Sequence, residues 1–204
     1  MQPAINKSVK EKEKWFDSDL EFNTLYPLSI QVLARYHWTP LDIARKAAQF
    51  LADNNDYVRI LDIGSGVGKF CLAGAWYTPN AFYYGVEQRK RLINYAEIAR
   101  RSLHMDNVSF IHGNFTQLDL KEYDHFYFYN AFYENLDGTD RIDDSIAYSG
   151  ELYNYYNWYL FNELQKKPKG TRLCTLCSLE SEVPPGFRVV KSDVNDFLKF
   201  WIKE

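Results

Sequence analysis

The sequence predicts an α/β fold with a mostly parallel sheet, helices on both of its faces and an antiparallel edge. Strand-like and helix-like segments alternate between residues 57 and 176, which is typical of parallel sheets with crossover helices. A glycine-rich loop directly follows the first strand segment, as at the carboxyl end of such a sheet. Two further strand segments, joined by a short polar turn, end the chain and indicate a terminal hairpin.

The first helix is expected to begin with Thr39 as its N-cap and Pro40 at its first position. Apolar side chains at helical spacing follow as far as Leu51. The parallel strands are expected at residues 57–63, 81–86, 107–112, 124–130 and 172–176, the helices at 67–77, 89–104 and 151–165, and the hairpin strands at 186–191 and 197–202.

The composition argues against several classes of protein. The 204 residues are enough for one well-buried domain, and no run of about 18 apolar residues is present to span a membrane. A net charge of −3 argues against a nonspecific nucleic-acid footprint, so nucleic acid is not the expected partner. Three cysteines, an odd number, are typical of a reducing compartment. The first residues contain no apolar signal core, so we expect a cytoplasmic protein.

We expect two regions along the chain. Residues 1–38 form an N-terminal tail and cap segment, and residues 1–14 lack apolar periodicity, as in a frayed tail or a solvated helix. Residues 39–204 form a single domain with a polar and aromatic insertion at about 133–167. Between 134 and 151 the insertion carries six acidic residues against Arg141 alone. Such a segment is either a solvated surface loop or an acidic lid that attracts a basic peptide and repels phosphates.

The most specific motif is Asp-Ile-Gly-Ser-Gly-Val-Gly at residues 62–68, directly after the first strand. Its glycines allow positive φ angles and a close approach of a ligand to the backbone. A pyrophosphate-binding fingerprint would place its third glycine at position 69, which is Lys69 here. The spacing therefore predicts a nucleotide-like cofactor without a pyrophosphate.

Side chains after the second and third strands extend the predicted site. Glu87 ends the second strand about 20 residues after the glycine loop, where a carboxylate accepts hydrogen bonds from ribose hydroxyls. A solvated acid at a strand end is the alternative. After the third strand, Asn114 and Phe115 would contact the edge and the face of an adenine, although Gly-Asn is also ordinary turn chemistry.

The fourth strand ends in an aromatic run that includes Asn130, Phe132 and Tyr133. Ligands of parallel sheets lie beyond the carboxyl ends of the strands, so these side chains should line the floor where a substrate meets the cofactor. Aromatic runs are more often part of a core. Asn130 differs, because a buried amide needs hydrogen-bond partners.

Together these motifs resemble the Rossmann-like class of S-adenosylmethionine-dependent methyltransferases over about residues 38–203. The segments DIGSGVGK (62–69), YGVEQ (84–88), GNF (113–115) and YNAF (129–132) are similar to motifs of the disruptor-of-telomeric-silencing type of lysine methyltransferases. The resemblance implies an αβα sandwich of three layers around a mostly parallel sheet of seven strands, with an antiparallel C-terminal hairpin strand. It also implies S-adenosyl-L-methionine as cofactor and S-adenosyl-L-homocysteine as product.

The resemblance further implies roles for individual residues. The cofactor would be bound by Thr39, Asp62, Gly64, Ser65, Gly66, Glu87, Gln88, Asn114, Phe115 and Asn130. The catalytic residues beside the transferred methyl group would be Asn130, Phe132 and Tyr133.

For the acceptor, the resemblance favours a lysine amine of a basic protein or peptide. An aromatic channel would favour the uncharged, nucleophilic form of lysine and would bind the methylated cation. The residues expected to form this channel are Tyr129, Phe132, Tyr133, Tyr148, Tyr153, Tyr155 and Trp158. Two alternatives remain open: an acceptor that is a nucleic acid or a small molecule, and a non-catalytic protein that binds the cofactor.

No metal site is expected. The four histidines show no metal-ligand spacing, and His37, beside Trp38, is expected to be structural. Cys174 and Cys177 form a single C-x-x-C pair within a predicted strand, which would direct the two thiols to opposite faces. One such pair is weak support for zinc, so buried free thiols are expected.

Overall fold

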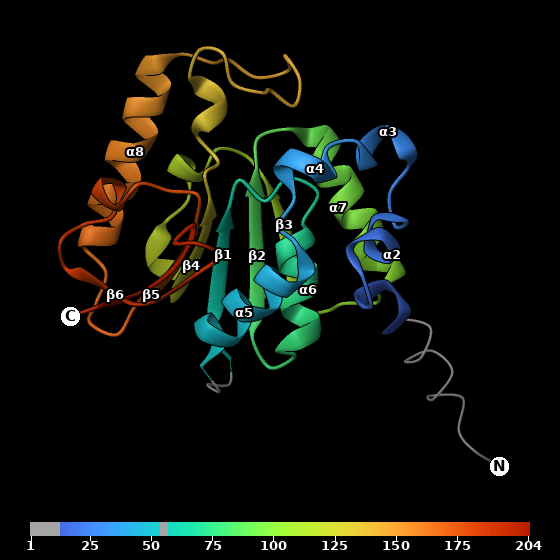
Figure 1. Cartoon of the computed structure of the whole chain (residues 1–204), viewed down its shortest axis with the longest axis horizontal. Coiled ribbons are helices and arrows are strands. Elements are labelled where there is room, and N and C mark those ends of the chain that lie inside the picture. Colours follow the sequence, from blue (N-terminus) through green and yellow to red (C-terminus); the bar gives the residue numbers. More distant parts are fainter. Residues whose placement is uncertain (1–12, 54–56) are drawn as a thin grey trace.

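The computed structural model describes residues 13–53 and 57–204. At its centre is a seven-stranded sheet with the strand order β3-β2-β1-β4-β5-β7-β6 (Figure 1). The parallel strands are β1 (Arg59–Ile63), β2 (Phe82–Glu87), β3 (Val108–His112), β4 (His125–Tyr129) and β5 (Arg172–Leu176), and the antiparallel strands are β6 (Phe187–Asp193) and β7 (Leu198–Lys203). This arrangement confirms the predicted fold class, including the antiparallel hairpin at the edge.

Helices cover the two faces of the sheet unequally. The first face packs against α5 (Leu41–Ala52), α6 (Lys69–Tyr77) and α7 (Lys90–Ser102). The second face packs against α8 (Gly150–Gln165) and short 3-10 turns, two of which replace an α-helix between β3 and β4. In Figure 1, α8 and α7 lie on opposite sides of the sheet. The crossover from β4 to β5 therefore supplies the only α-helix of the second layer within the described residues.

The strands at the centre of the sheet are buried on both faces. Ile60 of β1 belongs to the cluster under α5 and α6, whereas its neighbour Leu61 belongs to the cluster under α8. Both side chains are fully buried. A strand covered on two faces has a continuous apolar sequence rather than an alternating one, which explains why β1 could be located from the sequence.

The chain before α5 forms short helices that pack against α6. These are a 3-10 turn at Lys14–Phe16, α2 (Asp19–Asn23), α3 (Leu28–Gln31) and α4 (Ala34–His37). Phe16 stacks on Trp76 of α6 with ring centroids 4.7 Å apart, and the Tyr26 hydroxyl donates a hydrogen bond to the Val67 carbonyl at 2.9 Å. These contacts bring residues 13–38 to the edge of the glycine loop. The expectations for residues 1–12 lie outside the described residues.

The start of α5 corrects one prediction. The helix begins at Leu41 with Pro40 as its N-cap, so Thr39 is not the capping residue. The Thr39 hydroxyl is hydrogen-bonded to the Tyr127 hydroxyl at 2.9 Å. The Leu41 N–H instead donates to the carboxylate of Asp19 at 3.0 Å. A side chain from α2 thus satisfies a free N–H of the first turn.

Within residues 13–53 and 57–204, no helix combines the length and the apolar character that crossing a membrane requires.

Candidate functional site

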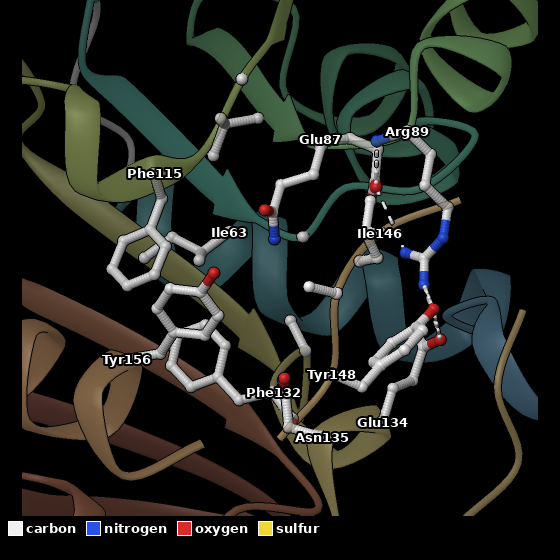
Figure 2. Close-up of a pocket in the computed structure, with 16 residues that line it drawn as sticks. Ile63, Glu87, Arg89, Phe115, Phe132, Glu134, Asn135, Ile146, Tyr148 and Tyr156 are labelled. Atoms are coloured by element: carbon white, nitrogen blue, oxygen red, sulfur yellow. Dashed lines mark hydrogen bonds and ion pairs between the residues drawn. The ribbon is translucent and has the colours of Figure 1, made fainter. Parts of the chain in front are cut away.

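Three neighbouring cavities open at the carboxyl ends of β1, β2 and β4, and Gly64 lines all three. We name each by one lining residue. The Phe115 cavity has a volume of about 40 Å³ and is drawn in Figure 2. The Asn130 cavity is larger, about 280 Å³, and the Thr39 cavity measures about 30 Å³. The glycine loop is therefore the common floor of a divided site.

The glycines of the loop are required for different reasons. Gly64, Gly66 and Gly68 all have positive φ angles, of 78°, 54° and 83°. A Cβ on Gly64 would lie 2.3 Å from the Cβ of Ala131, so this glycine permits the close approach of the loop after β4. A Cβ on Gly66 would meet no atom within 4 Å. The backbone of Gly66 thus faces open space that a ligand can occupy.

Glu87, at the end of β2, is held by three donors. Its carboxylate accepts hydrogen bonds from the Gly66 N–H at 3.3 Å and the Arg89 N–H at 2.8 Å, and it pairs with the Arg89 guanidinium at 3.3 Å. Its exposed fraction is only 5%. Burial raises the pKa of Glu87, whereas Arg89 and the two N–H groups act to lower it. The carboxylate is therefore fixed toward the Phe115 and Asn130 cavities, both of which it lines.

Asp62 is a buried carboxylate that lines the Thr39 cavity. It accepts a hydrogen bond from the Cys71 thiol at 3.6 Å, and among the described residues it has no cationic partner. Burial is the main cause that raises the pKa of Asp62 to about 8. In the same loop, the buried Ser65 hydroxyl has no hydrogen-bond partner in the described part of the chain. A ligand with a protonated amine would supply the positively charged partner that the Asp62 carboxylate lacks.

Lys69 also lines the Thr39 cavity, but its charge is already paired. Its ammonium group contacts the Asp19 carboxylate at 2.5 Å and lies 5.2 Å and 5.7 Å from the ring centroids of Phe22 and Trp38. Burial lowers the pKa of Lys69, and Asp19 opposes this effect. The residue that replaces the third glycine of a pyrophosphate fingerprint thus anchors the N-terminal helices.

The Phe115 cavity has an aromatic wall. Phe115 stacks against Phe132, with centroids 5.1 Å apart, and meets Tyr156 edge-on at 5.7 Å. Phe132 is buried in this cluster and does not line the Asn130 cavity. Packing under α8 turns its ring toward Phe115, and the expected place of Phe132 beside the acceptor stays a prediction.

Asn114 does not line any of the three cavities. Its amide nitrogen donates hydrogen bonds to the Gln88 side chain at 3.1 Å and to the Tyr156 hydroxyl at 2.8 Å. Its amide oxygen accepts from the N–H of Thr116 at 3.0 Å, as the cap of a 3-10 turn. Asn114 thus positions Gln88 and Tyr156, both of which line the Phe115 cavity. Its contact with an adenine stays a prediction.

The Asn130 cavity lies between the N-terminal helices and the loop after β4. Asn130 has a φ of 40°, and its side-chain amide makes no hydrogen bond to any described residue. Tyr133 lines this cavity and is 49% exposed. Tyr129, another lining residue, donates a hydrogen bond to the Tyr36 carbonyl at 3.3 Å. An unpartnered amide therefore lies among aromatic side chains at the cavity wall.

His37 was expected to be structural, yet it lines both the Asn130 and the Thr39 cavities. Burial lowers its pKa, an effect that the positive charge of Arg89 supports and the carboxylates of Glu134 and Asp140 oppose. The imidazole is therefore neutral at pH 7, a state in which one of its nitrogens can accept a proton.

The expected single aromatic channel is not formed. Tyr129 and Tyr133 line the Asn130 cavity, whereas Phe132 and Tyr148 line the Phe115 cavity. On α8, Tyr155 and Trp158 are exposed, and the Tyr153 hydroxyl donates to Glu182 at 2.7 Å. The helical period explains the difference, because it places Tyr156 inward and its aromatic neighbours outward or sideways.

The acidic insertion contacts a residue that the sequence did not single out. The Arg89 guanidinium donates to Glu134 at 2.6 Å and to the Tyr148 hydroxyl at 2.5 Å (Figure 2). It also donates to Asp143 at 3.3 Å. Two of the six acids of the insertion are thus paired inside the protein. The sequence did contain a signal for this pairing, namely an arginine two residues after Glu87 and an excess of acidic residues in the insertion.

No group of metal-ligating side chains is found among the residues that the structure describes. Cys174 is buried and Cys177 is exposed, and both thiols are free. Cys177 lies beyond the end of β5 with a φ of 57°. The expectation of two buried thiols within a strand is therefore wrong for Cys177.

Comparisons with known proteins agree with this geometry. A family model described as "Methyltransferase domain" matches residues 54–195. A tRNA (guanine-N(7)-)-methyltransferase of Synechococcus sp. (strain JA-3-3Ab) is 44% identical over 54 residues, which cover 26% of this chain and 23% of the relative. Another, of Prochlorococcus marinus (strain NATL2A), is 31% identical over 85 residues, covering 42% and 39%. The matched segments span less than half of either curated relative.

Solved structures with low sequence identity share the fold. The magnesium protoporphyrin IX methyltransferase of Synechocystis PCC 6803, with bound SAM, matches over 100% of both chains with a TM-score of 0.57 and 16% identity. An RNA methyltransferase of Salinibacter ruber, in complex with S-adenosyl-L-homocysteine, has a TM-score of 0.56 and 20% identity over 81% of this chain and 93% of that one. These comparisons give no support to a lysine methyltransferase of the disruptor-of-telomeric-silencing type.

Proposed function

The chain belongs to the methyltransferase-domain family and is a class I S-adenosylmethionine-dependent methyltransferase, and from this premise we propose that it methylates a nitrogen of a nucleobase in RNA. The observation that carries the proposal is the unpartnered Asn130 amide in an aromatic-walled cavity beside the glycine loop. An amide reads the edge of a base, and aromatic rings contact its faces. The curated relatives, which are tRNA methyltransferases, favour the same acceptor class.

The residues at the glycine loop suit the cofactor. Gly66 faces open space, Glu87 presents a fixed carboxylate, and Asp62 lacks a cation. In the proposal, Asp62 binds the amine of the methionine part and Glu87 accepts from the ribose hydroxyls. Phe115 contacts the adenine face in the Phe115 cavity. When bound, S-adenosylmethionine supplies an electrophilic methyl group that a nitrogen lone pair attacks.

The protein's contribution to the transfer is orientation, exclusion of water and movement of a proton. Asn130 holds the acceptor nitrogen in line by hydrogen-bonding to the edge of its ring. His37, which lines the same cavity in its neutral form, accepts the proton of an acceptor that must lose one. Tyr133, half exposed at the rim, contacts the face of the incoming base.

A lysine amine of a basic protein is the second candidate acceptor, because Asp140 lines the Asn130 cavity and is exposed. Asp137 and Asp144 of the same insertion are also exposed. Carboxylates at the mouth of a cavity attract a cationic side chain and repel a phosphate backbone. Glu134 and Asp143 do not add to this attraction, since Arg89 pairs with both.

A labelling experiment separates the two acceptors. The protein is incubated with S-adenosylmethionine carrying a radioactive methyl group and with a fractionated cell lysate, and each product is treated with nuclease or with protease. The proposal expects label that nuclease releases and protease leaves in place. Label that survives nuclease and is released by protease would support the lysine acceptor and contradict the nucleobase. The Asn130→Ala variant should bind S-adenosylhomocysteine and transfer little label.

A further inference from the structure

Arg89 joins two parts of the site that are far apart in the sequence. It lies directly before α7, and its side chain is only 5% exposed. One side of its guanidinium pairs with Glu87, which faces the glycine loop. The rest contacts Glu134 and Asp143 by ion pairs and the Tyr148 hydroxyl by a hydrogen bond. We call residues 134–148 the lid.

The lid is folded around the same guanidinium. Besides pairing with Arg89, Glu134 accepts a hydrogen bond from the Ile142 N–H at 2.9 Å. The Tyr148 hydroxyl donates to the Asp143 carbonyl at 2.6 Å. In the described part of the chain, every hydrogen bond between the lid and the turn after β2 involves the Arg89 side chain. Arg89 is therefore the polar attachment of the lid to the sheet.

The closed lid leaves too little room for a nucleoside. Ile146, Ala147 and Tyr148 of the lid line the Phe115 cavity together with Phe115 and Phe132. The remaining volume of about 40 Å³ accommodates only about three water molecules. Figure 2 shows Ile146 and Tyr148 at the cavity, on the side of Arg89. A cofactor whose adenosine occupies this cavity can enter only after the lid has moved.

We propose that Arg89 is a positioning residue that latches the lid over the nucleoside end of the cofactor, so that lid opening controls cofactor entry and release. The proposal rests on the cofactor site given above. Opening the latch does not dismantle that site, because two backbone N–H groups, those of Gly66 and Arg89, still hold the Glu87 carboxylate. The ribose-binding carboxylate thus stays in place while the lid moves.

The charges explain why one side chain suffices as a latch. The single positive charge of Arg89 faces the carboxylates of Glu87, Glu134 and Asp143. Carboxylates in such proximity repel one another unless a cation lies between them. The guanidinium offsets this repulsion, so without its positive charge the carboxylates of Glu134 and Asp143 would be driven away from Glu87 and the lid would separate from the turn after β2.

The test measures the association and dissociation rates of S-adenosylhomocysteine with the full chain by stopped-flow fluorescence. Two latch variants each weaken one lid contact and leave the Glu87–Arg89 pair intact. Glu134→Gln removes the negative charge of one ion pair, and Tyr148→Phe removes the hydrogen bond that Arg89 donates. We expect association and dissociation both to accelerate, by about tenfold, with a much smaller change in Kd. Hydrogen exchange of residues 134–148 in the ligand-free protein should accelerate in the same variants. The matched control is Asp144→Asn, an exposed lid acid that should change neither quantity.

Unchanged or slower association in both latch variants, with circular dichroism showing a folded protein, would contradict the latch alone. Faster hydrogen exchange of residues 134–148 without faster association of S-adenosylhomocysteine would mean that the variant only loosens the fold. This result would also contradict the latch. A wild-type protein that binds no S-adenosylhomocysteine would contradict the proposed function itself. The two failures are thus distinguishable.

Discussion

The carboxylate of Asp62 accepts a hydrogen bond from the thiol of Cys71 across 3.6 Å in the core beneath the glycine loop. Both groups are buried, and burial raises the pKa of each. The pKa of about 8 at Asp62 means that the ligand-free protein holds this carboxyl group protonated at pH 7. A cationic amine bound beside Asp62 would lower the pKa of its carboxyl group and favour the ionised form, because an opposite charge stabilises the carboxylate.

Cofactor binding should therefore release a proton from Asp62. Below pH 8, the affinity for S-adenosylhomocysteine rises with pH, and it levels off above that value. Calorimetry at pH 6.5 in buffers of different ionisation enthalpy should detect about one released proton per bound ligand in the wild type. The Asp62→Asn variant should release none. Equal proton release by the two proteins would contradict the role of Asp62.

The same pKa predicts how stability depends on pH. Asp62 binds its proton more tightly in the native state than in the unfolded chain, where its pKa returns to the ordinary value of 3.8. Its contribution to the free energy of unfolding is thus fully present below that value and is lost as the pH rises toward about 8. Urea titrations from pH 5 to 8 should show this slope in the wild type. In Asp62→Asn the slope should be smaller, and an unchanged slope would contradict the assignment.

Gly64→Ala should destabilise the fold through a clash with Ala131. A Cβ at position 64 would lie 2.3 Å from the Ala131 Cβ, and the φ of 78° is unfavourable for alanine. The matched control is Gly138→Ala, which has a similar φ of 76° and no atom within 4 Å of its added Cβ. We expect the control to lose about 1 kcal/mol and Gly64→Ala to lose about 2 kcal/mol more. Thermal unfolding measures both losses of stability. If Gly64→Ala and Gly138→Ala lost the same free energy of unfolding, Ala131 would move aside without cost.

Asn114→Asp tests whether Asn114 acts through its neighbours. The aspartate lacks the N–H donors that now hold Gln88 and Tyr156, so the wall of the Phe115 cavity loosens. We expect S-adenosylhomocysteine to bind more weakly by about tenfold. If Asn114 contacted the adenine amine directly, the aspartate would accept the same hydrogen bond and affinity would be retained. Tyr156→Phe, which removes one of the two partners, should show a smaller effect of the same sign.

His37→Gln should lower the turnover of an acceptor that loses a proton by about 100-fold. Burial lowers the pKa of His37 from its usual value of 6.5, so the wild-type rate should fall only below that pH. The glutamine variant should lack this acid limb and keep its affinity for S-adenosylhomocysteine. An acid limb that persists in the variant would exclude His37 as the proton acceptor.

The parts of the fold that could be predicted depend on residues close together in the sequence. The glycine loop and Glu87 lie in one strand–helix–strand unit, and β5 was located at its observed bounds, Arg172–Leu176. Thr39 was misassigned because it lies just before a helix, where a threonine commonly acts as the N-cap. In the structure the Thr39 hydroxyl is instead hydrogen-bonded to the buried Tyr127 hydroxyl. Local propensity does not reveal such a contact between distant segments.

The site was predicted less completely for the same reason. Arg89 meets the lid across more than forty residues of sequence, and each ion pair depends on how the insertion folds back. Phe132 and Asn130 are two residues apart, yet the positive φ of Asn130 turns the chain and separates their side chains into different cavities. Neither the Arg89 contacts nor the turn at Asn130 produces a periodic pattern or a motif spacing that can be recognised in the sequence.

The identity of the methylated product tests the central claim most directly. The protein is incubated with S-adenosylmethionine carrying a deuterated methyl group, together with total RNA and basic proteins, and both fractions are hydrolysed for mass spectrometry. We expect a deuterated methyl group on a nucleobase and none on lysine, with the signal strongly reduced in Asn130→Ala. Deuterated methyl-lysine without a labelled nucleoside would contradict it.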